Sequence, residues 1–150
     1  MESLGLLILR LITGGIFIVH GSPKLFGGPG KPVPALAAEK LGPGFAEAWE
    51  GHGGENWAQR LEQLGVPSPK AMAVLTGLVE VVGASCLMIG WQTRPASILL
   101  IGEMVAAIQK VHWKNGLMVS KGGYEFALSL LTACLALLFT GPGRASLDGR

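Results

Sequence analysis

Three charged side chains that could do chemistry stand inside long apolar runs of this 150-residue chain. Arg10 lies in LGLLILRLITGGIFIVHG, Glu80 in LVEVVGASCLMIG and Glu103 in ILLIGEMVAA. Burying such a charge in a membrane costs roughly 3 to more than 10 kcal/mol, so the charge is kept only where it finds a partner. We therefore expect Arg10 to lie within hydrogen-bonding distance of Glu80 or Glu103, and we take the three as the candidate catalytic set.

One cation between two carboxylates allows two interpretations. Two like charges close together raise the pKa of one carboxyl, so we expect Arg10 to pair with one ionised and one protonated glutamate. Such a group could bind the polar head of a ligand or relay a proton. The alternative is an ion-pair network that only holds the helices together.

A second polar set is predicted near the other end of the same helices. Counting about 1.5 Å per residue along helices of alternating direction places the first three charges at one depth and the second set near the opposite face. Histidine side chains there could hydrogen-bond a quinone carbonyl, and Lys24 is expected to reach water. No HxxxH or ExxH pattern falls on one helix, so no metal is expected. The possible quinone contacts are His20, Lys24, His112 and Glu125.

The composition indicates a membrane protein. The chain is 49% hydrophobic and only 15% charged, and its net charge is +2. A soluble domain of this length carries more charge, and a nucleic-acid-binding domain carries a basic patch that is missing here. Cys86 and Cys134 form no CxxC pair, which argues against a dithiol site.

Four apolar runs predict four membrane helices, near residues 4–20, 71–91, 95–112 and 124–140. The short link 92–95 forces the second and third helices to be antiparallel. We expect an all-α, integral membrane four-helix antiparallel bundle that forms a single domain over residues 1–150. The first run has no basic leader and no small-residue cleavage site, so we interpret it as a retained helix.

A long, proline- and glycine-rich loop, 21–70, separates the first two helices. Phe45 to Trp49 and Trp57 to Leu64 can form short amphipathic helices on the membrane surface. The loop is interpreted as a surface lid, and a lid over a binding site is the more specific alternative. His52 is expected to be exposed.

The ordered motifs of the chain resemble those of DoxX-type membrane proteins. The resemblance rests on the start LRLITGGIFIVHGSPKLFG, on LVEVVGASCLMIGWQTRPAS, on GGYE at residues 122–125 and on TGPGRASLD at residues 140–148. It covers nearly the whole chain and departs from some relatives in the long 28–62 connection. By position, the seven polar residues named above match the polar pattern of that family.

The resemblance implies a four-helix membrane protein linked to quinol oxidases and thiosulfate:quinone oxidoreductases. We therefore expect a subunit or partner of a quinone-linked oxidoreductase, whose redox centres belong to another protein. A small proton-coupled transporter or channel, and a passive membrane anchor for redox enzymes, stay open as alternatives. Expected contacts are a quinone, the lipid bilayer and a redox-enzyme partner in a prokaryotic plasma membrane; a homo-oligomer stays open.

Overall fold

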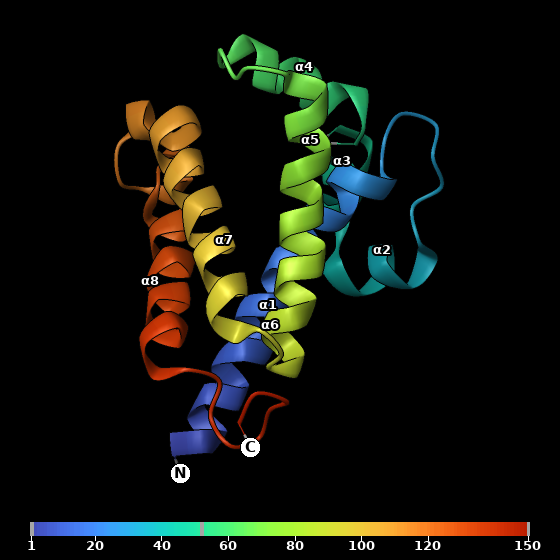
Figure 1. The fold of residues 1–150 in the computed structure, drawn as a ribbon. Coiled ribbons are helices and arrows are strands. Elements are labelled where there is room, and N and C mark those ends of the chain that lie inside the picture. Colours follow the sequence, from blue (N-terminus) through green and yellow to red (C-terminus); the bar gives the residue numbers. More distant parts are fainter. Residues whose placement is uncertain (1, 52, 150) are drawn as a thin grey trace. The chain divides into compact units, whose positions relative to one another are not determined.

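The computed structural model describes residues 2–51 and 53–149, and its regular structure in these ranges is entirely helical (Figure 1). His52 lies outside the described residues, so its predicted exposure is not assessed. The chain forms two compact units, which are described separately below. Unit 1 holds the chain up to Ile16 and from Val82 onwards, and unit 2 is Phe17–Val81.

Helices follow one another along the chain with short connections. The α-helices are α1 (Glu2–Phe26), α2 (Ala35–Leu41), α3 (Pro43–Gly51), α4 (Glu55–Gln63), α5 (Pro69–Leu78), α6 (Ala84–Ile89), α7 (Thr93–Ala107) and α8 (Glu125–Thr140). Two π-helical turns, η1 (Val79–Gly83) and η2 (Ile108–His112), follow α5 and α7. Two 3₁₀ turns, η3 (Trp113–Asn115) and η4 (Val119–Lys121), lie between η2 and α8.

The four predicted apolar helices are present, and apart from the end of the first their ends lie close to the expected ones, but their bundle arrangement remains a prediction. Among the described residues, two helices are long and apolar enough to cross a membrane, Glu2–Phe26 and Pro69–Ile89. The apolar α8 is shorter. The predicted end of the first helix near His20 is wrong, because α1 continues through Pro23 to Phe26. Pro23 has no N–H to donate to the Val19 carbonyl. The Ser22 hydroxyl lies 3.5 Å from that carbonyl oxygen instead.

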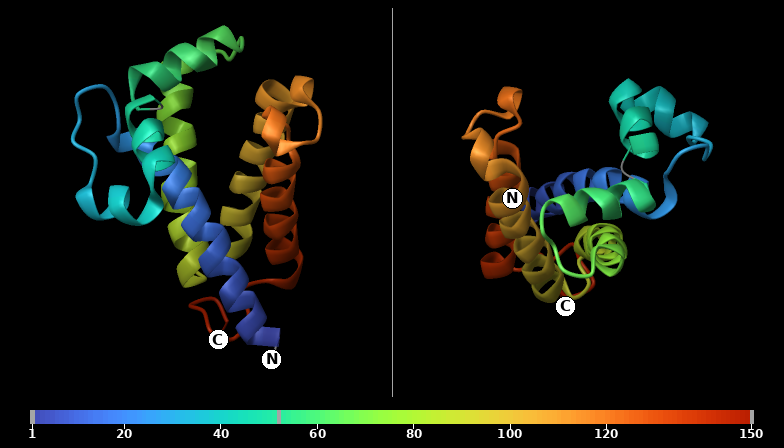
Figure 2. Two further views of the ribbon diagram at one scale, coloured as in Figure 1. Left: turned by 180° about the vertical axis from the view of Figure 1, so that it is seen from behind. Right: turned by 90° about the horizontal axis from the view of Figure 1, so that it is seen from above.

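Unit 1 is built around α7 and α8, which lie side by side in both views (Figures 1 and 2). Its core residues are apolar side chains from α6, α7 and α8, including Leu87, Leu100, Cys134 and Leu137. The first half of α1 packs on α6 at Gly14. A Cβ atom there would overlap the Met88 side chain and lie 2.9 Å from the Ala84 carbonyl oxygen. This glycine therefore sets how closely the two helices approach.

Unit 2 contains the second half of α1, the helices of the long connection, and α5. The predicted short helices are present as α3 and α4, and α2 is an additional helix that sequence periodicity did not indicate. Helix α4 packs across the beginning of α5 (Figure 2). The contact buries Ala58, Leu61 and Ala73, and Met72 packs against them. The connection is therefore a packed helical structure.

Adjacent glycines on α1 provide a matched test of this packing. We expect Gly14→Ala to destabilise the protein by about 1–3 kcal/mol, because the new methyl group overpacks the contact with α6. Gly15→Ala meets no atom within 4 Å and should be neutral or stabilising by roughly 0.5–1 kcal/mol, because alanine favours a helix over glycine. Thermal unfolding of both variants in one detergent measures the difference. Equal melting temperatures would contradict the described α1–α6 contact.

Candidate functional site

Arg10 is fully buried in unit 1 and is held by backbone carbonyl groups. Its side chain has 0% exposure. Nη1 donates to the Met88 carbonyl at 3.4 Å, and Nη2 donates to the Ala145 carbonyl in the C-terminal tail. Met88 lies in the last turn of α6, where carbonyl groups lack helical partners and carry the negative end of the helix dipole. The guanidinium therefore joins α1, α6 and the tail.

The tail is fixed at the same place by Asp148. Its carboxylate accepts hydrogen bonds from the backbone N–H groups of Thr93 at 2.8 Å and Gln92 at 3.0 Å, at the beginning of α7. The Asp148 N–H also donates to the Gly90 carbonyl at 2.8 Å. The pKa of Asp148 is lowered mainly by the Thr93 hydrogen bond, with smaller contributions from Gln92 and the nearby Arg10 charge. Asp148 thus caps α7 and supplies the negative charge near Arg10.

Within unit 1, the Arg10 guanidinium donates to carbonyl groups, and the carboxylate of Asp148 lies near it. The prediction did not include Asp148, and the predicted pairing of Arg10 with Glu80 or Glu103 stays a prediction. The prediction compared the depths of charged residues along the apolar helices. The C-terminal tail has no helical periodicity, so its residues could not be placed in this way. On the same helix, Thr13, Gly14, Phe17 and Gly21 are also buried.

Glu80 lies in unit 2 and pairs with Lys24. The ammonium and carboxylate are 2.6 Å apart, and their side chains are 12% and 4% exposed. The Lys24 ammonium also lies 4.7 Å from the centre of the Trp57 ring. Trp57 Nε1 donates to the Thr76 hydroxyl at 3.0 Å, which ties α4 to α5. A helix of the long connection therefore covers a buried ion pair, and the lid over a binding site stays a prediction.

Two glycines and a π-helical turn place this pair. A Cβ on Gly21 would lie 2.5 Å from the Glu80 Cβ, and one on Gly77 would lie 2.7 Å from the Leu25 side chain. The helices can therefore approach closely enough for Lys24 to reach Glu80. Glu80 itself lies in η1, and π-helical turns occur frequently at functional sites. The prediction that Lys24 reaches water is wrong, because α1 continues past Pro23 and keeps Lys24 on its buried face.

The remaining predicted site residues are distributed over both units. In unit 1, the His112 Nδ1–H donates to the Gly122 carbonyl at 2.7 Å, and Glu125 Oε1 accepts from the Val119 N–H at 2.5 Å. Both side chains hold the backbone of the link before α8. Glu103 is half-buried on α7 in unit 1, and His20 is exposed on α1 in unit 2. The quinone contacts predicted for His20, His112 and Glu125 stay predictions.

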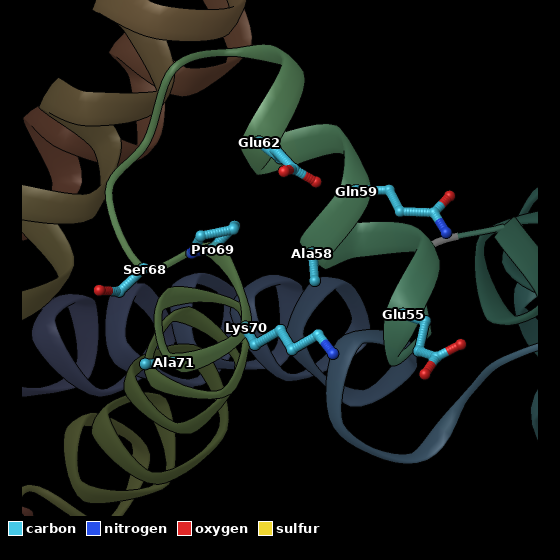
Figure 3. A pocket seen from close by; sticks show the side chains of 8 residues that line it. All are labelled: Glu55, Ala58, Gln59, Glu62, Ser68, Pro69, Lys70 and Ala71. Carbon is cyan, nitrogen blue, oxygen red and sulfur yellow. The ribbon is translucent and has the colours of Figure 1, made fainter.

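An open hollow of about 660 Å³ lies between α4 and the beginning of α5 (Figure 3). Its lining includes Glu55, Glu62 and Lys70 around the small side chain of Ala58. Lys70 extends along the hollow toward α4, and the mixed signs of these groups fit a solvated surface. The hollow therefore adds no chemistry to the ion pair.

The Asp148 cap predicts a specific pH dependence. Because the folded-state pKa of Asp148 lies below its ordinary value of 3.8, its contribution to stability is present above that value and is lost as the pH falls through the folded-state pKa. We expect Asp148→Asn to lower the melting temperature near neutral pH and to reduce its loss on acidification. Glu55→Gln, at an exposed position, is the control. An unchanged acid profile in Asp148→Asn would contradict the cap.

Comparison with known proteins places the chain among membrane proteins. Residues 5–113 match the family model described as DoxX. The "Uncharacterized membrane protein Rv3486" of Mycobacterium tuberculosis is 30% identical over 152 residues, which cover 95% of this chain and 78% of that protein. The "Inner membrane protein YphA" of Escherichia coli is 30% identical over 150 residues, covering 97% of this chain and 89% of its own length.

A third relative has a name that refers to chemistry. "Putative oxidoreductase CatD" of Bacillus subtilis is 29% identical over 146 residues, which cover 97% of this chain and 86% of that protein. No solved structure matches the chain significantly. The family match covers more than half of the sequence and includes Arg10, Lys24 and Glu80. The chain therefore belongs to the DoxX family of membrane proteins.

Proposed function

We propose that this protein is a multi-pass membrane subunit of a quinone-linked oxidoreductase in a bacterial plasma membrane. In this proposal the four apolar helices cross the bilayer, and a partner protein supplies the redox centres. Lys24 and Glu80 are the working residues, because they form a buried ion pair covered by Trp57. Arg10 has a structural role in holding the tail, and Glu103 keeps its predicted part in proton relay.

The burial of the Lys24–Glu80 pair is the observation that carries the proposal. A second ion pair, Lys40–Glu39, has the same 2.6 Å separation, but both of its side chains are 66% exposed. An exposed pair costs little to form and contributes at most about 1 kcal/mol. A buried pair must overcome desolvation that apolar side chains of similar volume would avoid. Ionisable groups kept at membrane depth are accordingly candidates for binding or proton transfer.

The polar groups of unit 2 fit the head group of a quinone. A quinone presents two carbonyl oxygens, which accept hydrogen bonds, on a flat ring. The Lys24 ammonium is a donor, and the ring of Trp57 beside it is a surface for stacking. Trp49 is 7% exposed, and its Nε1–H has no hydrogen-bond partner among the described residues. Such a buried donor is costly unless an acceptor reaches it.

Proton handling follows from the chemistry of the pair. When bound, a quinone would take up two electrons and two protons on reduction. Lys24 can orient a carbonyl oxygen by donating to it while Glu80 keeps the ammonium charged. Glu80 can hold a proton once the ammonium moves from the carboxylate to the ligand, because an unpaired buried carboxylate favours its neutral form. The pair therefore provides both a donor and a site for a mobile proton.

Substitution of the pair separates binding from folding. We expect Glu80→Gln to weaken quinone binding about tenfold or more, as for loss of a charged hydrogen-bonding group. Binding is measured by quenching of tryptophan fluorescence with a short-chain ubiquinone or menaquinone in nanodiscs. The double variant Lys24→Met/Glu80→Leu should fold as stably as the parent, because it leaves no lone charge. It should nevertheless lose quinone binding.

Glu39→Gln and Lys40→Gln, at the exposed pair, should leave binding unchanged. Full quinone binding by the stable double variant would refute the proposal. The same double variant, reconstituted in liposomes, also tests the transporter alternative. Glu80-dependent proton uptake by the protein alone, without quinone binding, would favour that alternative.

A further inference from the structure

The link between α7 and α8 exposes a group of apolar side chains in unit 1. Trp113 is 64% exposed, Met118 57%, Val119 56% and Leu117 49%. They lie in η3, in η4 and in the turn that joins them. Water would disfavour such a group at the tip of a connection, where polar residues are usual. We call residues 108–125 the α7–α8 link.

Three polar side chains of the link hydrogen-bond its own backbone and fix its shape. Besides the bonds of His112 and Glu125, Asn115 Nδ2 donates to the Gly122 carbonyl at 3.1 Å. Gly123 is buried under the backbone of the link, where an added Cβ would lie 2.6 Å from the Leu117 carbonyl carbon. The backbone N–H of Tyr124 donates to the Gly116 carbonyl at 3.0 Å. A closed backbone therefore holds the apolar side chains outward.

Charge on the link has one predominant sign. Lys110, Lys114 and Lys121 are exposed. The acid of the link, Glu125, is already engaged by the Val119 N–H. Trp113 and Tyr124 stack with ring centres 5.5 Å apart, and such aromatic side chains favour the level of the lipid head groups. Lysines around apolar and aromatic side chains are complementary to an anionic bilayer surface.

Helix length brings the link to that surface. At about 1.5 Å per residue, α8 with its 16 residues is roughly 24 Å long, whereas the hydrocarbon layer is about 30 Å thick. A short span draws its flanking residues toward the acyl boundary. We infer that the α7–α8 link docks on the anionic phospholipid head groups of the protein's own bilayer. This inference rests on the proposed membrane crossing of α7 and α8.

Lipid-specific quenching of Trp113 tests the inference. The protein is reconstituted in vesicles of phosphatidylcholine and phosphatidylglycerol, with bromine on the acyl chains of one lipid at a time. The Trp113 signal is the difference between the parent and Trp113→Phe. We expect brominated phosphatidylglycerol to quench this signal about fivefold more effectively than brominated phosphatidylcholine does. This ratio corresponds to the attraction of a single surface lysine for an anionic bilayer. The preference should disappear in Lys110→Gln/Lys114→Gln/Lys121→Gln.

A matched control removes three positive charges from unit 2, outside the α7–α8 link. The exposed lysines of unit 2 are replaced in Lys31→Gln/Lys40→Gln/Lys70→Gln, which should keep the preference. Equal quenching by both lipids would overturn the inference. Absence of quenching by either lipid would also overturn it, because Trp113 would then lie away from the acyl chains. Quinone binding, measured in the same vesicles, is independent of Trp113 quenching, so failure of the proposed function is distinguishable from failure of lipid docking.

Discussion

Burial of charge among apolar helices is the constraint on which the described structure depends. Arg10 cannot leave the interior of unit 1, so its donors must meet acceptors there. Free carbonyl groups at the end of α6 provide one acceptor, and the C-terminal tail provides another. The tail in turn brings Asp148 to the first N–H groups of α7. One cation thereby explains why a glycine-rich tail folds over the ends of two helices.

The second buried charge is satisfied by a different principle. Lys24 and Glu80 neutralise each other inside unit 2, and the contact of Trp57 with Lys24 connects that pair to the long connection. An arginine held by carbonyl groups stays charged and fixed. A lysine–glutamate pair can exchange partners and protons, because both groups titrate more readily than a guanidinium. This difference in chemistry is why we propose the Lys24–Glu80 pair, and not Arg10, as the working site.

The sequence predicted the helices better than the interaction partners of the buried charged side chains. Apolar periodicity predicted the four long helices and the burial of Arg10. In a membrane the backbone N–H and C=O groups must hydrogen-bond to one another, which strongly favours helices in apolar segments. It missed Asp148, which is far from Arg10 in sequence and follows no helical pattern. It also missed the Lys24–Glu80 pair, because the first helix was expected to end near His20, before Lys24. The π-helical turn at Glu80 has no signal in the sequence and changes which way that side chain points.

Infrared difference spectroscopy of the reconstituted protein tests the central claim most directly. Electrochemical reduction of added quinone should change the protonation of a buried carboxyl group, which is visible in its C=O stretching band. We expect this band to be lost in Glu80→Gln and in Lys24→Met/Glu80→Leu but to persist in Glu39→Gln. A band that survives in Glu80→Gln would contradict the assignment of the Lys24–Glu80 pair as the proton-handling site.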